Sequence, residues 1–236
     1  MDSKIKELSV FLPTYNESEN LPKVVENVVQ SASKYAKDWE LIIVNDGSKD
    51  NTQEIAESYS KKDDRIKVIT HKVNLGYGAS LKTGLYNSKY SWIAFIDSDG
   101  QFDFGEVGNF VKKQEETNAD LVIGYYKKRK VSFVKKITSK AWEAVVFIFF
   151  GLKVRDIDCG FKLISKKVVE GISKLESERG AFISSELLIK AKKKGFKIVE
   201  IPVTHYPRTK GVGTGRNINV IIKSFIDLFE LWRKLK

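Results

Sequence analysis

The stretch Trp92-Ile93-Ala94-Phe95-Ile96-Asp97-Ser98-Asp99-Gly100-Gln101 decides the fold, because five apolar residues run directly into two acids one residue apart. The apolar run predicts a buried strand, and the acids and glycine predict a turn at its end. Open α/β sheets bind their ligands at the carboxyl edge of the strands, where this turn would lie. Two carboxylates there suit Mg²⁺ or Mn²⁺ together with substrate phosphates. Asp and Gly also occur in turns for local reasons, so a purely structural turn stays open.

Around this stretch, the first half of the chain alternates strand-like and helix-like segments. Strands are expected at residues 8–12, 41–44, 66–70, 92–96 and 121–124. Helices are expected at about 21–32 and at 104–117, and two more lie between these, one starting near residue 52 and the other ending near residue 88. Pro22 falls in the first turn of its helix, where proline is tolerated, and Asn51 or Asp50 is expected to cap the helix that begins near Thr52. The alternation predicts an α/β fold with a mostly parallel sheet and helices on both faces.

The second half is less regular and ends in an amphipathic helix. A helix is expected at 137–150, and the final helix at 217–236 carries an apolar stripe formed by Ile218, Ile221, Ile222, Phe225, Phe229 and Trp232. Such a stripe is typical of core packing, although Lys, Arg and Trp beside it also fit a helix lying in a membrane interface. We therefore expect one domain over residues 1–216, followed by a helical elaboration over 217–236.

Charge is divided unevenly along the chain, whose net charge is +11. Residues 1–120 carry 15 Lys+Arg and 20 Asp+Glu, whereas residues 121–236 carry 26 and 10. A basic bias over a whole half indicates an anionic partner, either nucleic acid or an acidic membrane surface. The single Cys159 excludes an internal disulfide and a cysteine-based zinc cluster. Without an export signal or an apolar run of about 20 residues, a cytoplasmic location is expected.

Three turns follow three expected strands and share one chemistry. Pro13–Glu17 follows the strand at 8–12, Asn45–Ser48 follows 41–44, and Asp97–Gln101 follows 92–96. In a parallel sheet these turns emerge at one edge, so their acids Glu17, Asp46, Asp97 and Asp99 should converge there. Charges that gather and become buried are costly unless they are paired or bind a metal. Glu17 and Asp46 suit the ribose hydroxyls or base of a nucleotide, and Asp99, with Asp97, suits a metal.

Four ordered motifs resemble those of the family 2 glycosyltransferases, inverting enzymes of the GT-A fold. They are Pro13-Thr14-Tyr15-Asn16-Glu17, Asn45-Asp46-Gly47-Ser48, Asn74-x-Gly76-Tyr77-Gly78-Ala79 and Asp97-Ser98-Asp99-Gly100-Gln101. The likeness is greatest to the dolichyl-phosphate mannose synthase group and its polyprenyl-phosphate relatives, and it spans residues 8 to about 216. It implies a single Rossmann-like, mostly parallel sheet, with a nucleotide and metal half (1–124) and an acceptor half (125–216).

The resemblance also implies roles for individual residues. The nucleoside would be held by Pro13, Tyr15, Glu17, Asp46, Gly76, Asp97 and Ser98, and Mg²⁺ or Mn²⁺ by Asp97, Asp99 and Gln101. The catalytic set would be Asp99, Arg129, Asp156, Asp158 and Arg208, with Gln101, Lys127, Lys128 and Lys210 at the diphosphate or the acceptor phosphate. Arg208 and Lys210 precede a glycine-rich run that suits a lid over a leaving diphosphate, and an ordinary solvated loop is the alternative.

One departure from the family pattern concerns the sugar, and the charge of the second half concerns the acceptor. Gly124-Tyr125-Tyr126 stands where many mannose synthases have Gly-Ser-Arg, which leaves the sugar open, while residues 127–140 hold seven basic residues and no acidic one. A lipid monophosphate, with a second pKa of about 6, is largely dianionic at neutral pH and attacks without a strong base. A sugar hydroxyl would need a carboxylate base, for which Asp156 or Asp158 could serve.

Together these patterns predict a metal-dependent inverting hexosyltransferase. The donor would be a nucleotide-sugar of the GDP-mannose or UDP-glucose type, and the acceptor would be dolichyl or undecaprenyl phosphate. The reaction would take place at the cytoplasmic face of an anionic membrane, where a second protein that anchors the chain to the membrane is also possible. A saccharide hydroxyl acceptor is the first alternative. A non-catalytic nucleic-acid-binding or scaffold protein is the second, and the basic runs lack the interleaved aromatic residues of single-strand binders, so no nucleic acid is expected. His71 is expected as a turn residue, and a phosphate contact of His205 stays open.

Overall fold

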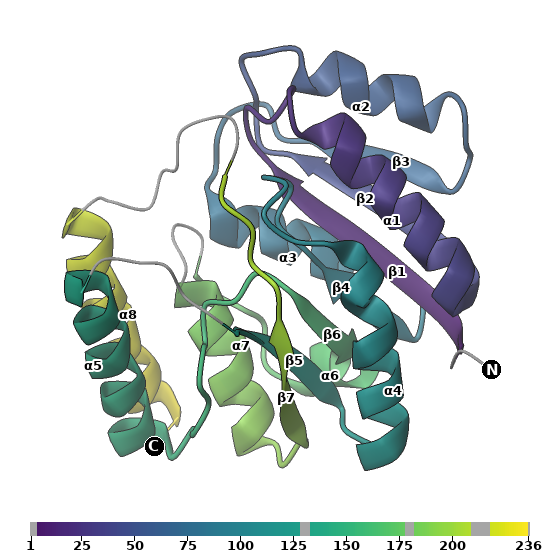
Figure 1. Cartoon of the computed structure of the whole chain (residues 1–236). Helices are drawn as coiled ribbons and strands as arrows, with labels where there is room; N and C mark the ends of the chain where they lie inside the picture. Colours follow the sequence, from purple (N-terminus) through teal and green to yellow (C-terminus); the bar gives the residue numbers. More distant parts are fainter. Residues whose placement is uncertain (1–3, 128–132, 178–181, 209–217, 236) are drawn as a thin grey trace.

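A seven-stranded sheet forms the centre of the computed structural model, which describes residues 4–127, 133–177, 182–208 and 218–235 (Figure 1). The strands are β1 (Ile5–Thr14), β2 (Ala36–Asn45), β3 (Ile66–Thr70), β4 (Trp92–Phe95), β5 (Leu121–Tyr126), β6 (Lys162–Ser165) and β7 (Ile198–Val203). Their order across the sheet is β3-β2-β1-β4-β6-β5-β7. Since β4 lies beside β1 and not beside β3, the chain crosses over between them, as in doubly wound sheets.

One strand of this sheet runs against the others. β1 pairs in parallel with β2 and β4, β2 with β3, and β5 with β7, whereas β6 is antiparallel to both β4 and β5. The carboxyl ends of β1, β2, β4, β5 and β7 therefore lie at one edge, together with the amino end of β6. The segment that precedes β6 reaches the same edge as the turns that follow the parallel strands.

Helices cover both faces of the sheet (Figure 1). One face packs against α1 (Leu21–Tyr35), α2 (Thr52–Ser60), the 3₁₀ turn η1 (Phe104–Glu106) and α4 (Val107–Thr117). The other packs against α3 (Tyr77–Asn87), α5 (Phe133–Phe150), α6 (Lys166–Gly171), α7 (Phe182–Lys193) and α8 (Ile218–Leu235). Successive strand residues face opposite sides, so Val10 enters the first core and Phe11 the second.

The expected elements of the first half are present. β1 and β2 extend beyond the expected 8–12 and 41–44, and the helix predicted at 104–117 starts with a 3₁₀ turn. Asp50, one of the two expected caps of α2, accepts a hydrogen bond from the Thr52 backbone N–H at 3.1 Å, while Asn51 makes no side-chain cap. β6 and β7 were not predicted. β6 is only four residues long, and its two apolar residues stand between a buried lysine and a buried serine, so the segment lacks the longer apolar run typical of a buried strand.

Close packing of α3 on β1 depends on a glycine. A Cβ atom added at Gly84 would lie 2.2 Å from the ring of Phe11, which itself stacks on Phe95 with ring centroids 5.3 Å apart. The helix therefore approaches the strand more closely than any side chain at Gly84 would allow. Among the helices described, none has the length and apolar character needed to cross a membrane.

Candidate active site

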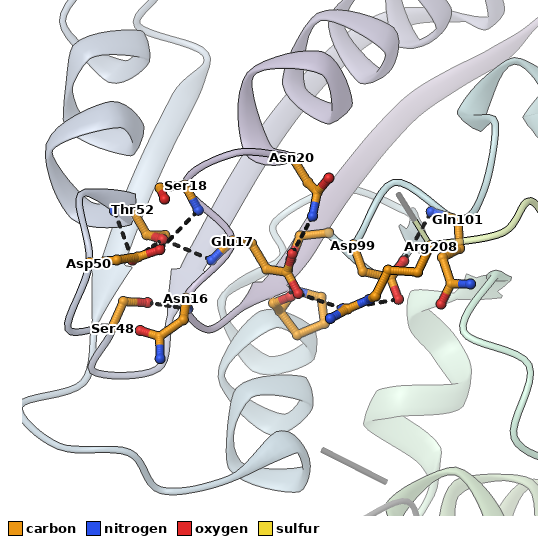
Figure 2. Close-up of polar contacts among 12 residues, drawn as sticks. Asn16, Glu17, Ser18, Asn20, Ser48, Asp50, Thr52, Asp99, Gln101 and Arg208 are labelled. Atoms are coloured by element: carbon orange, nitrogen blue, oxygen red, sulfur yellow. Dashed lines mark hydrogen bonds and ion pairs between the residues drawn. The ribbon is translucent and has the colours of Figure 1, made fainter. Parts of the chain in front are cut away.

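The turns after β1, β2 and β4 are tied together by hydrogen bonds, and Figure 2 shows those between the β1 and β2 turns. The Asn16 backbone N–H donates to Ser48 Oγ at 2.9 Å, and the Lys49 N–H donates to Asn16 Oδ1 at 2.8 Å. Ser98 Oγ donates to the Pro13 carbonyl at 2.8 Å. The three motifs that the sequence placed at one sheet edge therefore form one connected unit, as a shared binding site requires.

Arg208 joins two of these turns through their acids (Figure 2). Its Nη2 lies 2.6 Å from Glu17 Oε1 and 3.4 Å from Asp99 Oδ2. Asn20 Nδ2 donates to the other Glu17 oxygen at 2.7 Å. Glu17 is only 8% exposed, and this burial raises its pKa, an effect that the hydrogen bonds from Asn20 and Arg208 and the charge of Arg208 partly offset. One arginine from the far end of the chain thus sits between the predicted nucleoside and metal turns.

Asp97, which like Asp99 is half-buried, is enclosed by groups from two other segments. Burial raises its pKa to about 7, and the neighbouring charge of Asp99 adds to the rise. The Tyr77 hydroxyl donates to Asp97 Oδ1 at 2.9 Å, and the pKa of Tyr77 is raised well above its usual value, mainly by burial. A Cβ atom added at Gly160 would lie 2.1 Å from Asp97 Oδ2, so the loop before β6 forms the wall behind this carboxylate. Two acids in this setting favour a bound cation.

A fully buried lysine stands at the start of β6. Lys162 pairs in register with Phe95, donates from Nζ to the Cys159 carbonyl, and lies over the Phe95 ring at 5.1 Å from its centroid. Burial lowers its pKa. The acids whose charges oppose this lowering are Asp158, Asp156 and Asp97. No role for Lys162 was predicted from the sequence, although a lysine flanked by Phe161, Leu163 and Ile164 is a pattern which indicates that its charge is used.

The loop before β6 carries the predicted acids Asp156 and Asp158 to the same edge. Asp156 is buried and its Oδ1 accepts from the Asp158 backbone N–H at 3.2 Å, whereas the Asp158 side chain is exposed. Burial raises the pKa of the Cys159 thiol to about 12, which keeps it protonated at neutral pH. Cys159 is therefore a packing residue of this loop.

Asp46 is held by the glycine-rich segment that follows β3. Its Oδ1 accepts from the Leu75 backbone N–H at 2.9 Å and its Oδ2 from that of Gly76 at 2.8 Å. His71 Nδ1 lies 2.7 Å from the same Oδ1, and its Nε2 lies 2.9 Å from Thr83 Oγ1. The carboxylate thus fixes the shape of this part of the edge, and its contact with a nucleoside stays a prediction. His71, expected in a turn, bridges Asp46 to α3, which the sequence did not indicate.

Gln101 holds the segment that carries Arg208. Its Nε2 donates to the Tyr206 carbonyl at 2.9 Å, its carbonyl accepts from the Tyr206 N–H at 2.8 Å, and its own N–H donates to Asp99 Oδ1 at 3.0 Å. A role for Gln101 at the metal or diphosphate stays a prediction. His205 packs edge-on against the rings of Phe102 and Tyr126, at centroid distances of 5.3 and 4.6 Å.

Of the remaining predicted residues, some are described by the structure and others lie outside the described ranges. Pro13 and Ser98 are buried, Tyr15 and Gly76 are half-buried, and Lys127 is exposed just after β5. Three predicted basic residues, Lys128, Arg129 and Lys210, lie outside the described residues. Their assignment to the diphosphate and acceptor phosphate stays a prediction.

The carboxylates that the structure does describe fit one type of metal. Within the described ranges, no group of three or more His, Cys, Asp and Glu side chains could hold a metal ion by itself. Asp97 and Asp99 supply two carboxylates from one turn, and Mg²⁺ or Mn²⁺ commonly binds to one or two carboxylates and completes its shell with water and substrate phosphates. The donor set therefore fits a hard divalent cation shared with a diphosphate.

Comparison with known proteins places this site in a family context. Residues 9–172 match the profile described as Glycosyl transferase family 2. A dolichyl-phosphate β-glucosyltransferase of Trichomonas vaginalis is 30% identical over 236 residues, covering 95% of this chain and 72% of the relative. A dodecaprenyl-phosphate galacturonate synthase of Rhizobium johnstonii is also 30% identical, over 228 residues, 94% of this chain and 67% of the relative.

Solved structures resemble the fold at lower identity. Mannosyl-3-phosphoglycerate synthase from Rubrobacter xylanophilus matches with a TM-score of 0.72 at 16% identity, covering 98% of this chain and 74% of that one. Glucosyl-3-phosphoglycerate synthase from Mycobacterium tuberculosis, in complex with Mn²⁺, UDP and glucosyl-3-phosphoglycerate, matches with a TM-score of 0.65 at 19% identity, covering 98% and 77%. The mostly parallel sheet and its helices thus form the GT-A fold that the motifs predicted.

Proposed function

Because the chain belongs to glycosyl transferase family 2, we propose that it moves a hexose from a nucleotide-sugar to a polyprenyl phosphate, using Mg²⁺ or Mn²⁺. The observation that carries the proposal is the meeting of Asp97, Asp99 and Arg208 at the carboxyl edge of the sheet, two carboxylates for a metal beside a cation for a diphosphate. The lipid phosphate acceptor is supported by the relatives, which are named for transfer to dolichyl phosphate and dodecaprenyl phosphate.

The donor half of the reaction needs the leaving diphosphate to be held and neutralised. We assign the metal to Asp97 and Asp99, where a divalent cation would supply positive charge to the departing nucleoside diphosphate. The turn that holds these acids is hydrogen-bonded through Ser98 to the β1 turn, to which we assign the nucleoside. Donor binding and metal binding would then share one connected frame, which keeps the reacting groups in position.

Arg208 would supply a second positive charge to the diphosphate. Its guanidinium pairs with Glu17 and Asp99, and its side chain is 22% exposed, so it can exchange a carboxylate for a phosphate without a large movement. Charge-assisted contacts from arginine to phosphate are among the stronger hydrogen bonds in proteins. We assign to Arg208 the stabilisation of the negative charge that develops on the diphosphate as the sugar leaves.

The acceptor half requires cations more than it requires a base. A lipid monophosphate, with a second pKa of about 6, is already a nucleophile at neutral pH. The chain's excess of basic residues over positions 121–236 fits such an acceptor. A saccharide hydroxyl is the second candidate, favoured by one observation: Asp156 and Asp158 lie at the same sheet edge, where either could accept a hydroxyl proton.

Calorimetric titration of UDP and GDP, each with and without Mn²⁺, tests the donor side. We expect one nucleotide to bind, and to bind only weakly once the metal is removed with a chelator. The acceptor side is tested by measuring sugar transfer to a short polyprenyl phosphate and to a soluble saccharide. Failure of a folded sample to bind either nucleotide would refute the transferase assignment. Salt-sensitive DNA binding without metal binding would support the nucleic-acid alternative instead.

Replacing Arg208 by Gln should lower turnover about 100-fold to 1,000-fold, the usual effect of removing one donor that stabilises transition-state charge. Arg208→Lys should lose less, because it keeps the charge but not the forked geometry. Initial rates at saturating donor measure both. Arg65→Gln is the matched control, since Arg65 directly precedes β3, away from the carboxyl edge, where it pairs with Asp63 at 2.8 Å and lies over the Trp39 ring. Wild-type turnover in Arg208→Gln would show that this guanidinium serves the fold alone.

A further inference from the structure

Of the nine large apolar side chains that are exposed in the described part of the chain, five lie on two neighbouring helices. The members of this group, here termed the α5–α8 face, are Phe147, Ile148 and Phe149 of α5 and Ile226 and Phe229 of α8. Ile148 is the most exposed of them, at 75%. Phe149 packs against Trp232 with ring centroids 5.6 Å apart, so the two helices lie side by side, as Figure 1 shows. A contiguous exposed apolar surface of this kind marks an interaction site.

The opposite sides of both helices are anchored in the protein. Val146 of α5 and Leu228 and Leu231 of α8 are buried in the core that also contains α7. Trp142 Nε1 of α5 donates to Ser185 Oγ of α7 at 3.2 Å. Because each helix buries one side and exposes the other, the α5–α8 face has a fixed orientation on the molecule.

The two helices that form this face carry more basic than acidic residues. By sequence, α5 and α8 carry six basic residues, Lys135, Lys136, Lys140, Lys223, Arg233 and Lys234. Lys192 is adjacent to the end of α5, since its Cε would lie 3.9 Å from a Cβ atom at Gly151. The acids on the same helices are Glu143, Asp227 and Glu230. The basic residues outnumber the acids, so the complementary surface is anionic.

We propose that the α5–α8 face docks the protein onto a bilayer that contains anionic lipids. Aliphatic and aromatic side chains would enter the boundary between headgroups and acyl chains, with Trp232 near headgroup level and the basic residues on the phosphates. Protein–protein interfaces are depleted in lysine, which favours a membrane over a protein as the occupant. The choice of a bilayer rests in part on the lipid acceptor of the proposed function, whereas the apolar face and its charges do not.

The position of the face along the chain agrees with this orientation. Residues 128–132 separate the predicted phosphate contact Lys127 from α5, and residues 209–217 separate Arg208 from α8. The segments that end β5 and β7 and carry Lys127 and Arg208 reach the active-site edge of the sheet, and each helix is the next element described along the chain. A bilayer against the α5–α8 face would hold a lipid phosphate within reach of those segments.

Co-sedimentation with vesicles tests the proposal without donor, acceptor or turnover. We expect the protein to bind phosphatidylcholine vesicles containing about one third phosphatidylglycerol at least tenfold more tightly than pure phosphatidylcholine. The double variant Ile148→Glu/Phe229→Glu should lose at least tenfold of this binding. Val73→Glu is the matched control, because Val73 is 62% exposed but belongs to the segment after β3, and it should bind as the wild type does.

Two further measurements keep the outcomes distinct. Brominated phosphatidylglycerol should quench tryptophan fluorescence in the wild type and much less in Trp232→Phe. Transfer to a short, water-soluble polyprenyl phosphate should continue in Ile148→Glu/Phe229→Glu, because neither residue lies at the active site.

Equal vesicle binding by this variant and the wild type would overturn the proposal. A wild-type dimer that the same substitutions dissociate, without vesicle binding, would assign the face to a second copy of the chain. Vesicle binding without sugar transfer would retain the docking face and refute the function.

Discussion

Asp99→Asn is expected to lower turnover by about 1,000-fold or more, as removal of a group that organises transition-state charge commonly does. The substitution keeps the shape of the side chain and removes the charge that would hold the metal. The fold should persist, because Asp99 is only half-buried and its contact with Arg208 is long, at 3.4 Å. Initial rates across a Mn²⁺ titration measure the effect, and calorimetry should show that nucleotide binding no longer depends on Mn²⁺.

Asp64→Asn provides the control for this change of charge. Asp64 is an exposed acid in the turn between α2 and β3, remote from the carboxyl edge, and its loss should leave both turnover and metal dependence at wild-type values. If Asp99→Asn turned over as fast as Asp64→Asn, the assignment of the metal to the Asp97–Gln101 turn would be wrong.

Gly160→Ala is expected to reduce turnover by about 100-fold, the scale of loss that follows a misplacement of about 1 Å in an active site. The new Cβ atom would lie 2.1 Å from Asp97 Oδ2 and 2.5 Å from Cγ, so the carboxylate or the loop before β6 has to move. Movement of Asp97 alters the metal site directly. The apparent affinity for Mn²⁺ should therefore fall together with the maximal rate, and a metal titration of activity measures both.

Gly84→Ala is the control that separates displacement of the Asp97 carboxylate from a general loss of stability. Its Cβ atom would clash equally closely, at 2.2 Å, but with the Phe11 ring in the core on the α3 side of the sheet. Overpacking of this kind typically costs about 1–3 kcal/mol of unfolding free energy. We expect Gly84→Ala to melt at a lower temperature yet to retain its affinity for Mn²⁺ below the transition. Loss of Mn²⁺ affinity in both variants, in proportion to their loss of stability, would contradict a specific role for Gly160.

The meeting of the acid-bearing turns could be predicted from sequence because it depends on local patterns. Each motif turn follows an apolar strand, and parallel strands bring their carboxyl ends to one edge, so the meeting of the Pro13–Glu17 and Asp97–Gln101 turns follows from strand order alone. The Glu17 and Asp99 carboxylates duly share Arg208. The nucleoside contact of Asp46 stays a prediction, and in the structure that carboxylate accepts from the Leu75 and Gly76 backbone.

The sequence by itself determined the α/β class, the glycosyltransferase motifs and the turns that carry Glu17, Asp97 and Asp99, because periodicity and turn chemistry act over a few residues. Only the tertiary structure decided which residues from other segments contact these turns. The antiparallel direction of β6 brings Gly160 onto Asp97 and buries Lys162 beside it, and a short strand with a lysine and a serine shows no pattern that reveals its direction. Arg208 reaches Glu17 across 191 positions through the pairing of β7 with β5. Contacts over such separations depend on which strands become neighbours, and that is set by packing across the whole sheet.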